Sequence, residues 1–347
     1  MAASNARARS VSITDGSNRR PLSANSGLVA VGPPDGTIGL TLPVIALPPA
    51  PRHTCAMQQL TPFQGAILKR VVDEFREVTG VEAVVLGGSH ARGRARPDSD
   101  IDIGLYYWPG TAFSIQRVRQ IASRINDTPD PVVSGFGEWG RWVDGGAWLT
   151  IEGQRVDLLY RSLEKVEITF KDAVEGRFEI DFDQQPPFGF FGPTLLGEAA
   201  IAVPLHDPRS TLSGLKSKVS IMPEALAKAV VQSRLWSVEF GLAAFAPKFA
   251  ANGDVHGVAG CLIRFAQALV LTLFALNRVY LVNDKTSISE IDQFKIAPAS
   301  FGPRLRAILS NIGSTPEALE ASVDAIGVLF EEVRASAGKL YAPAWRL

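Results

Sequence analysis

Three carboxylates in two short stretches of the chain have the spacing of ligands for divalent cations. Asp100 and Asp102 lie two residues apart in the stretch SDIDIG, and Asp157 lies in the stretch RVDLLY. Side chains alternate between the faces of a β-strand, so we expect Asp100 and Asp102 to share one face. Like charges at this spacing repel one another unless a cation lies between them, and Mg²⁺ takes such oxygen ligands. A neighbouring strand carrying Asp157 would bring a third carboxylate to the same two ions.

A glycine-rich turn comes shortly before the first carboxylate pair. The run VEAVVL ends at Gly87 and Gly88, and Ser89 follows. Glycine lets backbone N–H groups approach a phosphate closely, and a helix that begins near Ser89 would favour negative charge at its first turn. Ser99, next to Asp100, offers another hydroxyl group. The turn and Ser99 together predict a triphosphate-binding site beside the ions.

The hydrophobic pattern indicates the elements that would position these groups. Thr61 is a favourable N-cap, and Pro62 suits the first position of a helix. Period-two alternation and short apolar runs indicate strands, whereas apolar residues at helical spacing indicate helices. We predict a helix ending at Gly80, strands over 81–86 and 100–108, a helix over 111–127, a hairpin over 146–161 with its turn near Glu152–Gly153, a helix from about Ser162, a loop over 184–193 and a short strand within 200–208.

Beyond about Ser210 the pattern becomes that of long helices. Segments 223–250, 255–282 and 315–341 carry apolar stripes at helical spacing, which is typical of a helical bundle. We therefore predict an α+β fold, a small mixed sheet with helices, followed by an all-helical bundle. The predicted organisation is a disordered N-terminal extension over 1–57, an α+β domain over 58–209 and the bundle over 210–347.

The composition narrows the possible partners and compartments. The chain has 347 residues, 46% of them hydrophobic, with 35 basic and 35 acidic side chains. This neutral balance disfavours a stable nucleic-acid complex, which depends on many phosphate contacts. Cys55 and Cys261 give no disulfide framework, which fits a cytoplasmic protein, and the longest apolar run, Ala268–Leu276, is too short to span a membrane. For the N-terminal segment two alternatives stay open, a transit peptide and an over-extended start with Met57 as the initiator.

Taken together, these motifs resemble the signature of the DNA polymerase beta-like nucleotidyltransferase superfamily. The resemblance covers about residues 62–208, and the bundle behind it is similar to that of kanamycin-type and other aminoglycoside adenylyltransferases. The glycines alone would be weak support, whereas a Gly-Ser turn, Ser-Asp-x-Asp and a distant strand aspartate form a specific combination. The residues that carry the resemblance are Gly88, Ser89, Ala91, Gly93, Ser99, Asp100, Ile101, Asp102 and Asp157.

The resemblance implies a nucleotidyltransferase fold and a role for each matching residue. Asp100 and Asp102 would bind two Mg²⁺ ions, Asp157 would hold the catalytic one, and Gly88 and Ser89 would hold the nucleoside triphosphate. The implied reaction transfers a nucleoside monophosphate from a nucleoside triphosphate, expected to be ATP, to a hydroxyl group of a small-molecule acceptor and releases pyrophosphate. The alternative is adenylylation of a partner protein, as in antitoxin-type nucleotidyltransferases.

Other side chains are candidates for binding the nucleotide or the acceptor. Lysines near the position of Lys285 in related enzymes reach the triphosphate, and we expect Lys285 to end a bundle helix. Glu239 lies on a predicted bundle helix, as does the glutamate proposed to activate the acceptor in kanamycin-type enzymes, although a solvated helix face is the plainer interpretation. An acid-lined wall would favour a cationic acceptor, and Glu138, Asp144 and Glu152 could form it.

Three arginines follow the glycine-rich turn and have two equal interpretations. They could contact phosphates or the acceptor, or they could lie on a solvated loop. A nucleotide-binding scaffold without turnover is disfavoured because the set of three carboxylates is complete. A template-dependent polymerase is disfavoured because the chain is neutral. The arginines are Arg92, Arg94 and Arg96.

Overall fold

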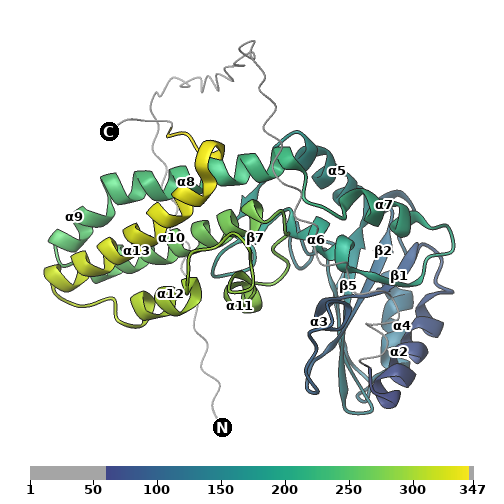
Figure 1. The fold of residues 1–347 in the computed structure, drawn as a ribbon. Helices are drawn as coiled ribbons and strands as arrows, with labels where there is room; N and C mark the ends of the chain where they lie inside the picture. Colours follow the sequence, from purple (N-terminus) through teal and green to yellow (C-terminus); the bar gives the residue numbers. More distant parts are fainter. Residues whose placement is uncertain (1–59, 344–347) are drawn as a thin grey trace, which may run out of the picture. The chain divides into compact units, whose positions relative to one another are not determined.

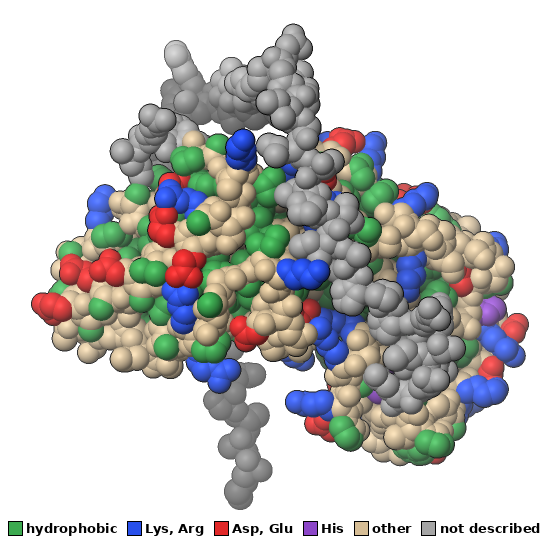
Figure 2. Space-filling view, in the orientation of Figure 1, with side chains coloured by type: hydrophobic (Ala, Val, Ile, Leu, Met, Phe, Trp, Pro, Cys, Tyr) green, Lys and Arg blue, Asp and Glu red, His purple; other side chains and the backbone are tan. Residues whose placement is uncertain are grey.

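The structure is a computed structural model that describes residues 60–343. The disorder expected over 1–57 lies outside the described residues, and so do Cys55 and Met57. On the face shown in Figure 2, basic and acidic side chains are interspersed.

The α+β part of the chain is built on a six-stranded mixed sheet, drawn on the right of Figure 1. The strands lie in the order β3-β4-β5-β2-β1-β8. β2 (Ile101–Tyr107) runs parallel to β5 (Gln154–Ser162), whereas the other neighbouring pairs are antiparallel. The predicted mixed sheet is therefore confirmed. Its other strands are β1 (Ala83–Leu86), β3 (Val132–Val133), β4 (Gly146–Ile151) and β8 (Val203–His206).

Helices α2 (Pro62–Phe75) and α4 (Ile115–Ile125) share one hydrophobic core with a face of the sheet. Thr61 caps α2, because its hydroxyl accepts a hydrogen bond from the Gln64 N–H and the Gln64 side chain accepts from the Thr61 N–H. The prediction that this helix continues to Gly80 is wrong. Gly80 has a φ of +91°, and an added Cβ would lie 2.5 Å from the backbone oxygen of Thr111, so the chain turns there against the segment that leads into α4.

The hairpin formed by β4 and β5 turns at the predicted residues. Glu152 and Gly153 both have positive φ, 53° and 82°, which is the backbone of a two-residue type I′ turn. The twist of this turn matches that of the strands it joins, and it fixes the pairing of Ile151 with Gln154. The register of β5, and with it the position of Asp157, follows from this turn.

A second core lies on the other face of the sheet and continues into the bundle. α5 (Leu163–Val174) begins after Ser162 as predicted, and Ser162 caps it. α6 (Thr194–Ile201) was not predicted. It is short and mostly apolar, so it lacks the amphipathic period that identifies longer helices. Between α5 and α6, β6 (Ile180–Asp181) and β7 (Phe190–Phe191) form a small two-stranded sheet, of which β7 lies within the segment 184–193 that was expected to be a loop.

The C-terminal part is the predicted helical bundle. α10 (Val255–Leu276) packs against α8 (Glu224–Ala244) and α13 (Pro316–Ala337), which lie together on the left of Figure 1. The shorter helices are α7 (Thr211–Val219), α9 (Ala246–Ala251), α11 (Ser287–Ile291) and α12 (Phe301–Ser310).

α10 is the most apolar long helix of the bundle. It has 22 residues, and its most apolar 18-residue window has a mean hydropathy of 1.9, so by length and composition alone it could cross a membrane, contrary to the expectation that no segment is long enough. However, 67% of this 18-residue window is buried inside the protein, as in the core helix of a bundle.

The predicted helix over 255–282 ends early. Asn277 is buried, and its side-chain amide donates hydrogen bonds of 2.8 Å to the carbonyl oxygens of Leu273 and Ile296. Arg278 then takes a left-handed φ of 57°, which ends the helix. The segment after it leads to a short 3₁₀ helix, η2 (Asp284–Thr286).

Candidate active site

Asp102 and Asp157 lie side by side on neighbouring parallel strands. Asp102 of β2 pairs with Asp157 of β5, and Asp100 directly precedes β2. The strands are parallel and in register here, so carboxylates that are 55 residues apart in the sequence come from adjacent backbone positions. The structure thus brings the three predicted carboxylates to one end of β2.

The pKa values of these carboxylates show that their charges interact. Burial, then the charges of Asp157, Asp100 and Glu198, together raise the pKa of Asp102 to about 6, against Arg161, which lowers it. Burial and the charge of Asp100 also raise the pKa of Asp157. The cluster therefore carries more negative charge than the protein around it compensates, which favours binding of a cation or a proton.

The predicted glycine turn packs directly against Asp102. The Gly87 N–H donates a 2.8 Å hydrogen bond to the carbonyl oxygen of Asp102. Gly88 has a φ of +56°, and a Cβ at this position would lie 1.8 Å from Asp102 Oδ2. Only glycine fits both the backbone and the space, so the turn and the carboxylate form one site.

A short helix, α3 (Gly88–Ala91), follows this turn. The Ala91 N–H donates to the carbonyl oxygen of Gly87, so the N–H groups of Gly88 and Ser89 precede the first helical hydrogen bond. Ser99 is fixed on the loop before β2, where its hydroxyl accepts a 2.9 Å hydrogen bond from the Arg96 N–H. Because Ser99 is the acceptor in this bond, its hydroxyl proton stays available for donation to another group.

Arg155 is a component of the site that was not predicted. Its Nε lies 2.6 Å from Asp100 Oδ1. Burial and the charge of Asp100 raise the pKa of Asp157, and the charge of Arg155 partly offsets them by lowering it. Arg155 and Asp157 are two positions apart on β5 and so share a face. The same alternation that paired Asp100 with Asp102 could have identified it.

A buried ion pair lies behind the carboxylates. Arg161 of β5 and Glu198 of α6 pair through two hydrogen bonds of 2.6 and 3.0 Å, and the Arg161 side chain is only 6% exposed. Glu198 contributes to the raised pKa of Asp102. No local pattern indicated Glu198, because α6 was not predicted.

Comparison with known protein families identifies the α+β part. Residues 68–176 match the family model described as a nucleotidyltransferase domain, a range that holds the glycine turn and all three carboxylates. This chain contains a nucleotidyltransferase domain. It is accordingly a transferase of the nucleotidyltransferase type, and a nucleotide is its substrate.

Two other comparisons extend beyond the nucleotidyltransferase domain. Residues 195–285 match a family model described as a domain of unknown function, DUF4037. The crystal structure of a nucleotidyltransferase-like protein from Exiguobacterium sibiricum 255-15 is similar with a TM-score of 0.37 and 8% identity, over 78% of this chain and 76% of that chain. No curated protein matches the sequence.

Lys285 does not end a bundle helix in this nucleotidyltransferase, so that prediction is wrong. α10 ends at Leu276, and Lys285 lies in η2, where its N–H donates to the Asn283 side chain. Burial and the charge of Asp100 raise the pKa of Asp157, and Lys285 lies close enough to the site to lower it in part. A segment of the C-terminal part therefore brings positive charge to the third carboxylate.

Two of the three arginines after the turn pair within the protein. Arg92 and Arg94 both form ion pairs with Glu290 of α11, and Arg92 also donates to the Thr286 hydroxyl. The Arg92 and Glu290 side chains are only 13% and 6% exposed. These pairs connect the glycine turn to the segment that carries Lys285. Arg96 pairs with its neighbour Asp98 on the exposed loop.

The acidic side chains expected to line an acceptor wall do not form one. Asp144 is buried and accepts a 2.9 Å hydrogen bond from the Tyr107 hydroxyl. Glu152 lies in the hairpin turn, 3.4 Å from Arg70, and Glu138 is exposed. The proposed wall for a cationic acceptor is therefore not supported.

Glu239 also has partners within the bundle. Its carboxylate accepts a hydrogen bond from the Tyr341 hydroxyl and lies 3.7 Å from Arg334. These contacts join α8 to α13 and to the C-terminal segment. They give Glu239 a structural role in the bundle.

The carboxylates fit a hard divalent cation by their chemistry. Within residues 60–343, no group of three or more His, Cys, Asp and Glu side chains has the arrangement of a metal site. All three groups at the end of β2 are nevertheless oxygen donors, and among the described residues Asp100 alone of the three forms an ion pair. The adjacent, uncompensated carboxylates of Asp102 and Asp157 are what a divalent ion would neutralise.

Proposed function

We propose that the chain transfers a nucleoside monophosphate from a nucleoside triphosphate, ATP in the first instance, to a hydroxyl group of a small-molecule acceptor in a Mg²⁺-dependent reaction. The observation that supports this proposal is the register of β2 and β5. It sets two carboxylates side by side, each with a raised pKa, directly against a turn that only glycine can form.

The carboxylates of Asp100, Asp102 and Asp157 would hold two Mg²⁺ ions. Bound there, the ions would neutralise charge on the triphosphate and lower the pKa of the acceptor hydroxyl. Asp100 would exchange its contact with Arg155 for this role, which frees the guanidinium to pair with a phosphate oxygen.

The glycine turn and the surrounding donors orient the triphosphate. The N–H groups of Gly88 and Ser89 precede the first helical hydrogen bond and can donate to phosphate oxygens. The Ser99 hydroxyl, two positions before β2, and the Lys285 ammonium are further donors. Together they place the α-phosphorus within reach of the acceptor oxygen.

Asp157 accepts the proton of the acceptor hydroxyl. Burial and Asp100 raise its pKa, which makes it a better base than an exposed aspartate. The acceptor oxygen forms a bond to the α-phosphorus, and the bond from that phosphorus to the oxygen bridging the α- and β-phosphates breaks. Pyrophosphate leaves with the electron pair, so atoms and charge balance.

We propose residues 58–209 as the nucleotidyltransferase domain and 210–347 as the bundle that supplies Lys285. The pairing of Arg92 and Arg94 with Glu290 supports this division of roles, because it fixes η2 and α11 beside the glycine turn. The bundle would then complete the nucleotide site.

A nucleotide-transfer screen tests the proposal. ATP, GTP, CTP and UTP labelled at the α-phosphate are offered with Mg²⁺ to the full chain, together with small metabolites or a cell lysate. We expect label in a small-molecule product and release of pyrophosphate, both abolished in Asp102→Asn and retained in Asp130→Asn, which replaces an exposed carboxylate. Label in protein would support the partner-protein alternative. Transfer of the γ-phosphate, or full activity of Asp102→Asn, would contradict the proposal.

A further inference from the structure

A cavity of about 440 Å³ lies beside α8 and α10, outside the carboxylate site. Its volume is in the range of small-molecule sites. Apolar side chains form much of its lining, including Phe182 and Phe188 from the segment between β6 and β7 and Ile263 from α10. Two arginines also face it, Arg234 of α8 and Arg264 of α10.

Arg234 is held in the cavity wall with part of its guanidinium unused. One terminal nitrogen donates a 2.7 Å hydrogen bond to the Ser233 hydroxyl, and the group lies over the Phe178 ring at 5.7 Å. Its Nε is buried and has no hydrogen-bond partner. Burial and the charge of Arg264 both lower the pKa of Arg234. A buried donor without a partner and next to a like charge is costly for the protein alone.

Arg264 adds a second positive charge. It is exposed and lies over the Phe182 ring at 5.5 Å. In the part of the chain that the structure describes, neither Arg264 nor Arg234 forms an ion pair with a carboxylate. The cavity therefore combines an aromatic lining with two uncompensated guanidinium groups.

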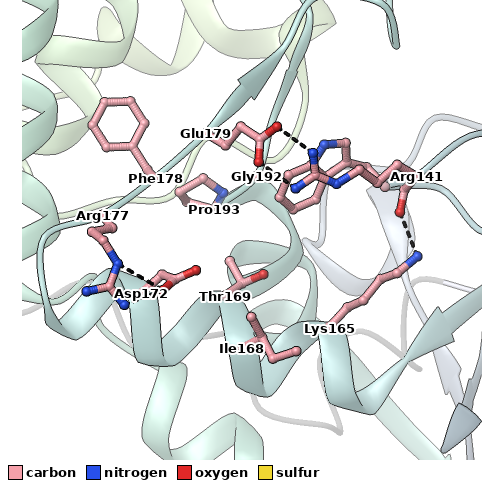
Figure 3. A pocket seen from close by; sticks show the side chains of 11 residues that line it. Arg141, Lys165, Ile168, Thr169, Asp172, Arg177, Phe178, Glu179, Gly192 and Pro193 are labelled. Carbon is pink, nitrogen blue, oxygen red and sulfur yellow. Dashed lines mark hydrogen bonds and ion pairs between the residues drawn. The ribbon is translucent and has the colours of Figure 1, made fainter. Parts of the chain in front are cut away.

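A second cavity, of about 370 Å³, shows the opposite arrangement (Figure 3). There the Arg141 guanidinium forms two hydrogen bonds with Glu179, of 2.7 and 2.6 Å, and Arg177 pairs with Asp172. Its basic groups are neutralised by the protein's own carboxylates, so they need no ligand.

We propose that the cavity of Arg234 and Arg264 binds a small molecule that has a carboxylate or phosphate group and an apolar, preferably aromatic, body. The anionic group pairs with the two guanidinium groups and supplies the missing acceptor for Arg234 Nε. The apolar body contacts the phenylalanine rings and α10.

The position of the cavity identifies this molecule as the acceptor of nucleotide transfer, an assignment that rests on the proposed function. Gln267 lines the cavity and donates a 3.4 Å hydrogen bond to Asp284 of η2. In the same segment, the Thr286 hydroxyl accepts a 3.3 Å hydrogen bond from Arg92, which directly follows α3 and the glycine turn. One short segment therefore joins the cavity to the glycine turn of the carboxylate site. Two guanidinium groups would repel a cationic acceptor such as an aminoglycoside.

A binding experiment without nucleotide tests the charge preference of the cavity. The full chain is screened by ligand-observed NMR against matched aromatic triplets, in which each ring carries a carboxylate, a phosphate or an ammonium group. We expect carboxylates and phosphates to bind and their ammonium counterparts not to bind. Arg234→Gln and Arg264→Gln should each weaken binding at least tenfold, whereas Arg177→Gln, in the second cavity, should leave it unchanged. Arg264 is exposed, so its variant tests the site even if Arg234→Gln is unstable.

The outcomes separate this inference from the proposed function. Equal binding of the ammonium members, or unchanged binding in both cavity-arginine variants, would overturn the anion site whatever the chain does with nucleotides. Bound anions that carry a hydroxyl group are then offered with α-labelled nucleoside triphosphate. We expect labelled product from the wild type, and in Arg264→Gln the rate of product formation should fall in proportion to the loss of anion binding. Transfer to a cationic acceptor that is unaffected by Arg264→Gln would overturn the acceptor assignment. If the wild type shows no Mg²⁺-dependent binding of nucleotide, the proposed function itself is contradicted.

Discussion

Replacing Asp102 by asparagine is expected to stabilise the ligand-free protein at pH 8. Burial, then Asp157, Asp100 and Glu198, raise the pKa of Asp102 from 3.8 to about 6, so its negative charge is unfavourable in the folded state. A shift of about 2 pKa units corresponds to about 3 kcal/mol. The buried asparagine amide offsets part of this gain, which leaves about 1–3 kcal/mol at pH 8.

The pH dependence of this difference is the sharper test. The pKa of Asp102 is higher in the folded than in the unfolded protein, so the folded state binds the proton first as the pH falls. This stabilisation is fully present below the unfolded value of 3.8 and is lost as the pH rises through about 6. The advantage of Asp102→Asn should therefore shrink by about 2 kcal/mol between pH 8 and pH 4.5.

Urea unfolding in EDTA at several pH values measures the effect. Carboxylates outside the cluster of Asp100, Asp102 and Asp157 titrate equally in both proteins and cancel in the difference between them. Asp130→Asn, at an exposed position, is the matched control and should show no pH-dependent gain. A stability difference between wild type and Asp102→Asn that stays constant from pH 4.5 to pH 8 would refute the electrostatic account of the site.

Three further substitutions test other parts of the site. Gly88→Ala places a Cβ 1.8 Å from Asp102 Oδ2, so nucleotide affinity measured by calorimetry should fall at least tenfold. In contrast, Gly153→Ala is also at positive φ but its Cβ would meet open space, so it should lower the free energy of unfolding by only about 1–2 kcal/mol and leave the nucleotide affinity intact. Equal nucleotide affinities of Gly88→Ala and Gly153→Ala would argue against contact between the glycine turn and the Asp102 carboxylate. Glu198→Gln leaves the buried Arg161 without its charged partner and should lower the free energy of unfolding by about 3 kcal/mol, and an unchanged urea midpoint would show that the pair is not structural. Asp157→Asn should retain most of the Mg²⁺–nucleotide affinity but lose most of the single-turnover rate, and transfer at the wild-type rate would remove Asp157 as the base.

The sequence predicted the parts of the site that depend on local pattern. The alternation at Asp100 and Asp102, the turn at Glu152–Gly153 and the glycines before α3 each follow from backbone geometry over a few residues. The turn fixes the register of β5 against β4, whereas the parallel pairing that sets Asp102 beside Asp157 joins strands far apart in the sequence.

Other parts depend on contacts that no local pattern encodes. The apolar segment after α10 continues the hydrophobic pattern of a helix, and only the buried contacts of Asn277 with Leu273 and Ile296 show where the helix ends. The position of Lys285 was therefore mispredicted. Arg234 and Arg264 meet only because α8 and α10 pack together, so the anion cavity was not visible in the sequence.

Calorimetric titration with a non-hydrolysable ATP analogue tests the central claim most directly, because it needs no acceptor. The analogue is titrated into the wild type, Asp102→Asn and Asp130→Asn, each in Mg²⁺ and in EDTA. We predict binding by the wild type and Asp130→Asn in Mg²⁺, with at least tenfold weaker binding in EDTA and in Asp102→Asn. Equal affinity of the wild type in Mg²⁺ and EDTA, together with unchanged binding by Asp102→Asn, would contradict a metal–nucleotide site at these carboxylates.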